Sequence, residues 1–550
     1  MKIKILVAVL FLSLSSTFVL AQTTLIKNIQ GYTLNNKQLQ QFSAIQFTDD
    51  KIDRILTLDD AIDEQKDWHV IDGKGATLLP GLIDAHGHVL SYGESLLQVD
   101  LVKSKSEHKA VMRAVSFAAK NPQSLWIKGR GWNQVEWPNN SFPTAKSLDQ
   151  YFPNKPVFLA RVDGHAVWVN SKAMALANIN KQTKSPAGGE IIRDNKGQPT
   201  GVFIDNAMSL IYKNIPALTL KQKKNMLVKS MNSLASFGLT SVHDAGIDNE
   251  DLQAYQELRN EGNMPIRINA MLYLPSKNWQ TTLSQGTFQS PDNMLNFNSV
   301  KIQADGALGS RGAALIKEYS DHPGHQGLLL HDKKELIEYI DTAMQAGFQV
   351  NTHAIGDNAN KVVLDVYQAS IQETKTKTLR HRVEHAQILR LEDIPRFNEL
   401  GVIASMQAIH ATSDKNMALD RIGNKRILGA YAWRKLLNEN AIIAAGSDFP
   451  VESPNPFLGL HAAITRQDIK NQPHNGWYPK EKMTHIEAFR SFTSHAAYAG
   501  HQEDIIGSLL PGKKADFILI DSNIFTMPVT SIWQTKVLKT WVNGTLVFSR

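Results

Sequence analysis

The stretch LLPGLIDAHGHVL, residues 78–90, ends a short apolar run with two histidines, His86 and His88, separated by one glycine. The run has the length and apolar character of a buried strand. Residues i and i+2 of a strand point to the same side, so the two histidines are expected to project together from its end. Alone, the pair is a weak signal of a metal site, because two structural, hydrogen-bonded histidines would show the same pattern.

Short apolar runs recur through the middle of the chain and alternate with segments of helical spacing, such as residues 333–347 and 360–373. Alternating strands and helices predict βα units and a parallel sheet. Eight such units predict an α/β fold, a (β/α)₈ TIM-like barrel, with its chemistry at the carboxyl ends of the strands. The predicted strands are residues 82–86, 240–245, 266–272, 299–305, 348–353, 381–385, 402–407 and 441–448.

The two ends of the chain have a different pattern. Residues 22–80 and 504–550 contain short alternating strands and turn signals, including the hairpin dipeptide Asn543-Gly544. They predict one small β-sandwich formed by both termini around a barrel at residues 81–503. A long insertion at about residues 90–239 separates the first two barrel strands, and we expect it to cover the barrel mouth and shape substrate choice.

Polar residues occupy corresponding places in several of the predicted strands. His353, His385 and Asp448 each end a strand, and Lys301 lies inside the fourth. Each has an ordinary interpretation: a structural histidine, a helix-capping aspartate or a lysine that reaches the surface. Their convergence with the first two histidines on one rim of one barrel favours a metal centre.

The first 21 residues are typical of a secretory signal peptide. Lys2 and Lys4 form a basic region, residues 5–14 are apolar, and small residues precede a cleavage point after Ala21. A membrane anchor is the alternative, but the apolar run is short for a span and contains serines. We expect an exported protein, periplasmic or secreted, without stable membrane insertion once the signal is removed.

Composition narrows the chemistry. The chain of 550 residues has no cysteine, which excludes disulfides, thiolate metal ligands and a cysteine nucleophile. Any metal must therefore use nitrogen and oxygen ligands. The net charge is +7, and the basic residues are scattered among acidic ones rather than clustered, so we expect a solvated surface and no nucleic-acid partner.

Seven segments together resemble the amidohydrolase superfamily and, more narrowly, the YtcJ-like amidohydrolase-3 family. They are LLPGLIDAHGH, GLTSVHDAG, VKIQADGALGSRGA, NTHAIGD, RVEHAQ, AAGSDFPV and IGSLLPGKKADFILID. The resemblance covers nearly the whole chain after the signal peptide. It implies a metal-dependent hydrolase on a barrel with a flanking β-sandwich.

The resemblance also implies roles for individual residues. His86, His88 and Asp448 would bind one metal ion, and His353 and His385 a second. Lys301 matches a position at which related enzymes carry a carboxylated lysine that bridges two metals; a lysine beside a single metal is the alternative. The ions would be two zinc ions per chain, with iron, manganese or cobalt also compatible with such ligands.

Three further residues are candidate substrate contacts. His165 lies in a segment that resembles one recurring in the family. His410 lies in a segment that resembles a family Gln-Pro-x-His motif, although Ala408 replaces the proline. Arg311 has the charge to hold an anionic group. His243 and Asp305 face the same region by strand alternation, or are interior polar residues with satisfied hydrogen bonds.

The resulting prediction is a metal-dependent amidohydrolase that cleaves a non-peptide carbon–nitrogen bond of a small molecule. Asp448 would take a proton from the attacking water and return it to the leaving nitrogen. The alternatives are a mononuclear deaminase or an esterase-like hydrolase on the same barrel, or a non-catalytic binding protein.

Overall fold

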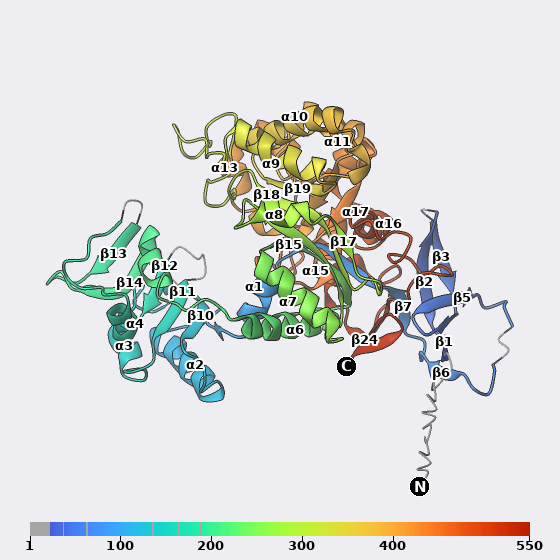
Figure 1. Cartoon of the computed structure of the whole chain (residues 1–550), viewed down its shortest axis with the longest axis horizontal. Coiled ribbons are helices and arrows are strands. Elements are labelled where there is room, and N and C mark those ends of the chain that lie inside the picture. Colours follow the sequence, from blue (N-terminus) through green and yellow to red (C-terminus); the bar gives the residue numbers. More distant parts are fainter. Residues whose placement is uncertain (1–21, 37, 62–63, 135–136, 162–165, 187–188) are drawn as a thin grey trace, which may run out of the picture.

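The computed structural model describes residues 22–36, 38–61, 64–134, 137–161, 166–186 and 189–550. The expected signal peptide at residues 1–21 lies outside these ranges. Figure 1 shows a central barrel, a lobe formed by the insertion on one side and sheets from the two termini on the other. No helix in the described ranges is long and apolar enough to cross a membrane.

The described residues form a nearly closed barrel of eight parallel strands, which confirms the predicted fold class and the eight strands. The strands follow chain order around the barrel, from β8 to β22. Several are buried along their whole length, as expected for strands covered by helices outside and side chains inside. Their bounds are β8 (Leu82–Gly87), β15 (Leu239–Ile247), β16 (Arg267–Leu274), β18 (Leu295–Gln303), β19 (Gln349–Ala354), β20 (Arg382–His385), β21 (Ile403–Met406) and β22 (Ile443–Ala445), and β17 (Phe288–Gln289) pairs with β18.

Helices surround the barrel (Figure 1). In α9 (Lys333–Gln345) the buried side chains Leu336, Ile340 and Met344 recur at helical spacing, and a capping box of Asp332 and Glu335 begins the helix. The other helices of this region are α1 (Val89–Leu96), α6 (Leu220–Ser236), α7 (Asn249–Asn260), α8 (Trp279–Ser284), α10 (Asp357–Thr374), α11 (Ile394–Leu400), α12 (Ala408–Asp414), α13 (Ala418–Arg426), α14 (Trp433–Asn438), α15 (Pro456–Thr465), α16 (His485–Ser491) and α17 (Ser494–Ala499).

The first and last barrel strands meet without a regular ladder among the described residues. The backbone N–H of Asp448 donates to the carbonyl of His86 at 2.7 Å, and that of His88 donates to Phe449 at 2.8 Å. The hydroxyl of Ser447 donates to Asp84 at 2.6 Å. A Cβ atom at position 446 would lie 2.6 Å from the backbone nitrogen of His86. Only glycine therefore allows the chain to approach β8 this closely.

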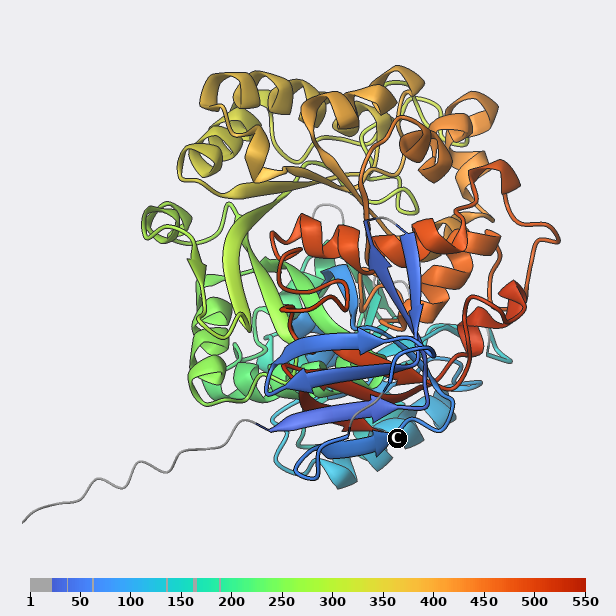
Figure 2. The same cartoon turned by 90° about the vertical axis from the view of Figure 1, so that its right-hand side faces the viewer.

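Residues of the two termini together form two β-sheets that pack against each other, as predicted (Figure 2). One sheet has the order β5 (Lys51–Leu56), β4 (Ala44–Thr48), β1 (Thr23–Lys27) and β6 (His69–Asp72). The other has the order β25 (Thr545–Ser549), β24 (Val537–Val542), β23 (Phe517–Ile520), β7 (Thr77–Pro80), β2 (Gln30–Asn35) and β3 (Gln38–Phe42). Phe47 and Phe517 pack between the sheets with ring centroids 5.4 Å apart. Asn543 and Gly544 both have positive φ in the turn between β24 and β25, as a type I′ hairpin requires.

A buried ion pair joins the barrel to the terminal sheets. Arg267, at the start of β16, donates from Nε to Asp516 at 2.6 Å and from Nη2 to the same carboxylate at 2.8 Å. Only 1% and 3% of the two side chains are exposed. The backbone N–H of Asn543 also donates to Asp516, at 2.8 Å.

The insertion forms a separate sheet with its own buried cores, and Trp132, Trp137 and Trp168 pack together inside it. Helices α1 and α6, although inside the expected range 90–239, pack against each other at the barrel. The sheet has the order β13 (Gly189–Arg193), β14 (Pro199–Asp205), β12 (Ala166–Val169), β11 (Val157–Arg161), β10 (Ile127–Trp132) and β9 (Val99–Asp100), with α2 (Glu107–Lys120), α3 (Ala145–Asp149), α4 (Ser171–Leu176) and α5 (Ser209–Tyr212).

Candidate metal centre

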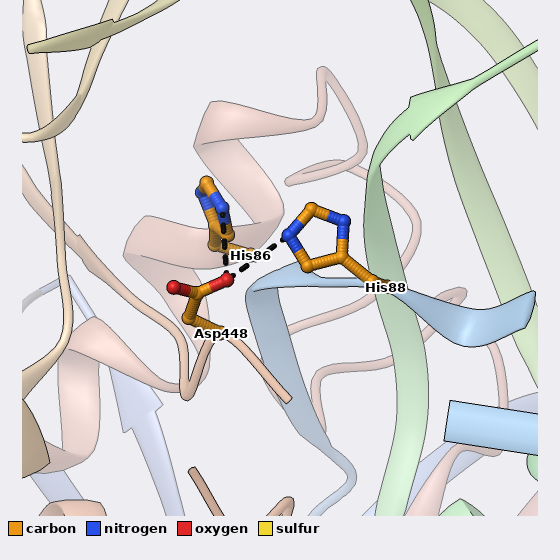
Figure 3. Close-up of side chains that lie close together, drawn as sticks. All are labelled: His86, His88 and Asp448. Atoms are coloured by element: carbon orange, nitrogen blue, oxygen red, sulfur yellow. Dashed lines mark ion pairs between the residues drawn. The ribbon is translucent and has the colours of Figure 1, made fainter. Parts of the chain in front are cut away.

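One group of potential ligands forms where the first and last barrel strands meet. His86 lies near the end of β8, His88 follows this strand, and Asp448 follows β22 (Figure 3). Asp448 Oδ1 lies 3.5 Å from His86 Nε2 and 3.0 Å from His88 Nε2. The three ligand atoms are within 4.8 Å of one another, a spacing that could hold a metal ion.

A second group shares the same carboxylate. His385, at the end of β20, and His410, on α12, approach Asp448 from its other side, and the three form another potential metal site. His410 Nε2 lies 3.8 Å from Asp448 Oδ2 and, although buried, has no hydrogen-bond partner among the described residues. His410 therefore lies next to the candidate ligands. The substrate contact that its motif suggested stays a prediction.

His353 belongs to the same cluster of rings. Its ring centroid lies 4.5 Å from that of His385. Its Nε2 lies 3.3 Å from Asp305 Oδ1 but makes no hydrogen bond within the described residues. Asp305 is fully buried and accepts backbone N–H groups from Ala314, Ile355 and Gly356, so it fixes the loop that follows β19.

Lys301 enters the cluster from β18. Its Nζ lies 3.5 Å from His86 Nε2, and only 5% of the residue is exposed. Burial lowers the pKa of this lysine, which favours its neutral amine. A neutral amine is the form that can react with carbon dioxide and that does not repel a cation.

Buried hydrogen bonds orient two of the histidines. His86 Nδ1 contacts Glu384, which Arg382 Nε also contacts at 2.8 Å and to which Ser405 donates at 2.6 Å. His385 Nδ1 donates to Gln407 Oε1 at 2.7 Å. In both rings the contact places the proton on Nδ1 and leaves the lone pair on Nε2, which is the arrangement usual for metal-binding histidines.

The electrostatics favour metal-binding protonation states. Burial lowers the pKa of His86 to about 4, and burial also lowers the pKa of His385 well below its usual value. Burial acts to raise the pKa of Asp448, but the hydrogen bond with His88 and the neighbouring histidines hold it well below the ordinary range. Neutral imidazoles and an ionised carboxylate are the forms that bind metals.

Two of the candidate ligands have strained backbones. His385 has φ of 72° and Asp448 has φ of 60°, in the left-handed region that non-glycine residues seldom adopt. Such conformations persist only where the surroundings hold them, and they gather at functional sites. In both residues this backbone conformation directs the side chain toward the candidate metal centre.

A cavity of about 530 Å³ opens over the cluster, and its lining includes His86, His88, His353, His385, His410, Lys301 and Asp448. No described residue between 90 and 239 lines it, so the role expected for the insertion as a cover stays a prediction. Arg311 does not line the cavity, and its Nη2 pairs with Asp321 at 2.9 Å. His165 lies outside the described residues. The roles of both in substrate binding stay predictions.

His243 and Asp305 are interior polar residues. His243 is fully buried beside Arg382, at 2.9 Å between Nδ1 and Nη1, and does not line the cavity. Glu384 and Gln407 were not among the sequence-based candidates. A signal was present for Glu384: it lies two residues after Arg382 in one strand, so the two opposite charges are on the same face.

The barrel, the terminal sheets and the histidine–aspartate groups at the strand ends together define the amidohydrolase fold. An amidohydrolase family model (Amidohydro_3) matches residues 69–548, so the chain belongs to this family of hydrolases.

Several relatives span nearly the whole chain. The chain is 33% identical to LONG AFTER FAR-RED 3 of Arabidopsis thaliana, covering 86% of this chain and 82% of that protein. It is 31% identical to YtcJ of Bacillus subtilis (86% and 90% covered) and 26% identical to an N-substituted formamide deformylase of Arthrobacter pascens (88% and 90%). An uncharacterised metal-dependent hydrolase from Pyrococcus horikoshii has a similar structure, with a TM-score of 0.77, 28% identity and 92% and 99% coverage.

Proposed function

We propose that the protein is a metal-dependent amidohydrolase that cleaves a non-peptide amide-type bond of a small molecule. The observation that carries this proposal is Asp448, a buried carboxylate shared by two groups of histidines at the mouth of one barrel. The similarity to an N-substituted formamide deformylase supports an amide substrate.

The donor set fits divalent cations. It offers imidazole nitrogens and carboxylate oxygens, in two groups that share Asp448. Such ligands suit zinc, and also iron, manganese or cobalt. We propose two ions: one would be held by His86, His88 and Asp448 and the other by His353 and His385, and Lys301, once carboxylated, would supply a further carboxylate to the site.

When bound, divalent ions at such a site lower the pKa of a water molecule and polarise a carbonyl oxygen. Asp448 is placed to accept a proton from the attacking water and to deliver it to the leaving nitrogen. His410 Nε2, which lacks a hydrogen-bond partner in the described structure, is available to the substrate. Glu384 and Gln407 keep the histidine rings in place throughout.

The metal content of the purified protein tests the site. Elemental analysis is expected to find about two ions per chain. In Lys301→Ala this number falls to one or fewer, and a short carboxylate such as propionate restores part of it by replacing the carbamate. Lys361→Ala, which changes an exposed lysine on α10, is the control. Equal metal content in all three proteins would show that Lys301 is not needed for metal binding.

Turnover tests the role of Asp448. Asp448→Asn keeps the shape of the side chain but cannot accept the proton, so hydrolysis of N-formyl and N-acetyl amines is expected to fall by about 10²–10⁴-fold. Most of the metal stays bound. Normal hydrolysis by this variant would overturn the role, and release of ammonia from aryl amines by the parent protein would identify a deaminase instead.

We also propose export, on the pattern of residues 1–21. Expressed with its full sequence in a Gram-negative bacterium, the protein is expected in the periplasm with Gln22 as its first residue, as N-terminal sequencing would measure. Retention of Met1 in the membrane fraction would indicate an anchor.

A further inference from the structure

Two further carboxylates line the cavity beside the candidate metal centre. Apart from Lys301 and the candidate metal ligands, the charged residues that line it in the described structure are Asp414 and Glu452. The remaining lining residues are uncharged and include Tyr273, Gln303 and Gln387. An anionic group on a substrate would therefore meet carboxylates at this wall, whereas a cation would be attracted.

Asp414 has no cationic partner in the described residues. Its Oδ2 accepts hydrogen bonds from the hydroxyl of Tyr431 at 2.7 Å and the amide of Gln387 at 3.2 Å, both neutral donors. No hydrogen bond within the described chain reaches Oδ1. The nearest lysine in sequence, Lys415, pairs with Asp468 at 2.7 Å instead.

Neighbouring residues hold both carboxylates in place. Tyr431 is 2% exposed and also receives a hydrogen bond from Gln387 at 2.8 Å, so the Asp414 side chain is fixed from behind. Glu452 accepts the hydroxyl of Ser413, the residue before Asp414. Fixed carboxylates lose little freedom on binding a cation, which favours recognition.

The same cavity contains buried polar groups that point to a ligand. Lys301 and Asp448 line it and are 5% and 8% exposed. His410 and Asp414 are four residues apart on α12, so they lie on one face of the helix with Cβ atoms about 5–6 Å apart. A molecule that reaches from beside His410 to beside Asp414 along this face thus spans about four extended carbon–carbon bonds.

We propose that Asp414, assisted by Glu452, binds a protonated amine at the far end of the substrate, so that the preferred substrates are N-acylated diamines. The proposal rests on the amidohydrolase function proposed above and adds the substrate class. A mono-N-acyl diamine with about four methylene groups matches the spacing and places its amide at the metal centre. N-acyl amino acids of the same length would be disfavoured by their carboxylate.

Binding without turnover tests the subsite first. Hexylammonium and hexan-1-ol are titrated calorimetrically into the full chain, before and after treatment with a chelator that prevents coordination of the amine. Hexylammonium is expected to bind about 10- to 100-fold more tightly than the alcohol in both samples. Asp414→Asn removes this preference, Asp414→Glu keeps part of it, and Asp420→Asn, on exposed α13, leaves it intact. Equal binding of both probes by the parent protein would overturn the proposal.

Turnover of three substrates of matched length then tests specificity. The substrates are N-acetyl-1,4-diaminobutane, N-pentylacetamide and N-acetyl-4-aminobutyrate, which are cationic, neutral and anionic. The ratio of kcat/KM for the cationic over the neutral compound is expected to exceed about 10 and to fall toward one in Asp414→Asn. If Asp414→Asn does not fold, Glu452→Gln is expected to lower the same ratio.

The outcomes separate the two proposals. Selective binding of hexylammonium without hydrolysis of any amide would retain the subsite and refute the amidohydrolase function. Hydrolysis of all three amides at similar kcat/KM, or preference for the anionic one, would retain the function and refute the subsite.

Discussion

Two chemically different residues orient the candidate ligands. Glu384 is a carboxylate beside His86, whereas Gln407 is a neutral amide beside His385. A carboxylate partner raises the basicity of an imidazole more than an amide does. The group that contains His86 is therefore expected to bind its cation first as metal is added to the stripped protein, with the group that contains His385 second.

Gln407 is predicted to act on metal affinity without touching the metal. Gln407→Leu leaves His385 Nδ1 without its acceptor, so the affinity of the weaker site is expected to fall about 10- to 100-fold. Competition with a fluorescent chelator measures this affinity. Gln407→Glu, which retains an acceptor, is expected to preserve it, and unchanged affinity in Gln407→Leu would show that packing alone holds the ring.

Most candidate ligands were accessible to sequence analysis because they lie at or near the end of a predicted strand. Their supporting residues were not, since the contact between Glu384 and His86 joins positions 298 residues apart. His410 illustrates an intermediate case: its motif marked it as functional, but only the fold brings it to Asp448.

At the scale of elements, periodicity located the barrel strands but not all of their ends. The last strand was expected to reach residue 448, whereas β22 ends at Ala445. The close approach of Gly446 to β8 and the positive φ of Asp448 interrupt the extended backbone there. The residues that depart from strand geometry are those that position the site.

The start of α9 offers a prediction for a single element. Asp332 accepts the backbone N–H of Glu335 at 2.9 Å, and Glu335 returns the contact to the Asp332 N–H at 2.9 Å. Asp332→Ala is expected to cost about 1 kcal/mol locally. Hydrogen exchange of the first-turn amides would then speed up about fivefold, whereas Asp332→Asn would change it little. Equal exchange in all three proteins would contradict this capping role.

At the scale of the whole molecule, Arg267 and Asp516 join the barrel to the terminal sheets. Arg267→Met leaves a buried carboxylate without its cation and is expected to lower the free energy of unfolding by about 3–5 kcal/mol. Arg267→Met with Asp516→Leu is expected to recover much of this loss. Urea denaturation, monitored by tryptophan fluorescence, measures the free energy of unfolding of each variant.

Arg259→Met provides the matched control, because the ion pair of Arg259 with Asp292 is more exposed, at 27% and 40% of the side chains. Its cost is expected to stay below about 1 kcal/mol. Equal losses of unfolding free energy at the two positions would contradict the prediction that the buried pair stabilises the fold more than the exposed pair. No local pattern predicted this pair, since its residues lie 249 positions apart.

The meeting of β8 with β22 has a consequence for the life of the protein. Few backbone hydrogen bonds join these strands, yet His86, His88 and Asp448 face one another across them. A cation bound there would cross-link the two ends of the barrel, so metal occupancy and resistance to proteolysis become linked equilibria. By the same linkage, Ser447→Ala, which removes a hydrogen bond between the strands, would weaken cation affinity, and scarcity of metal would itself mark the protein for degradation.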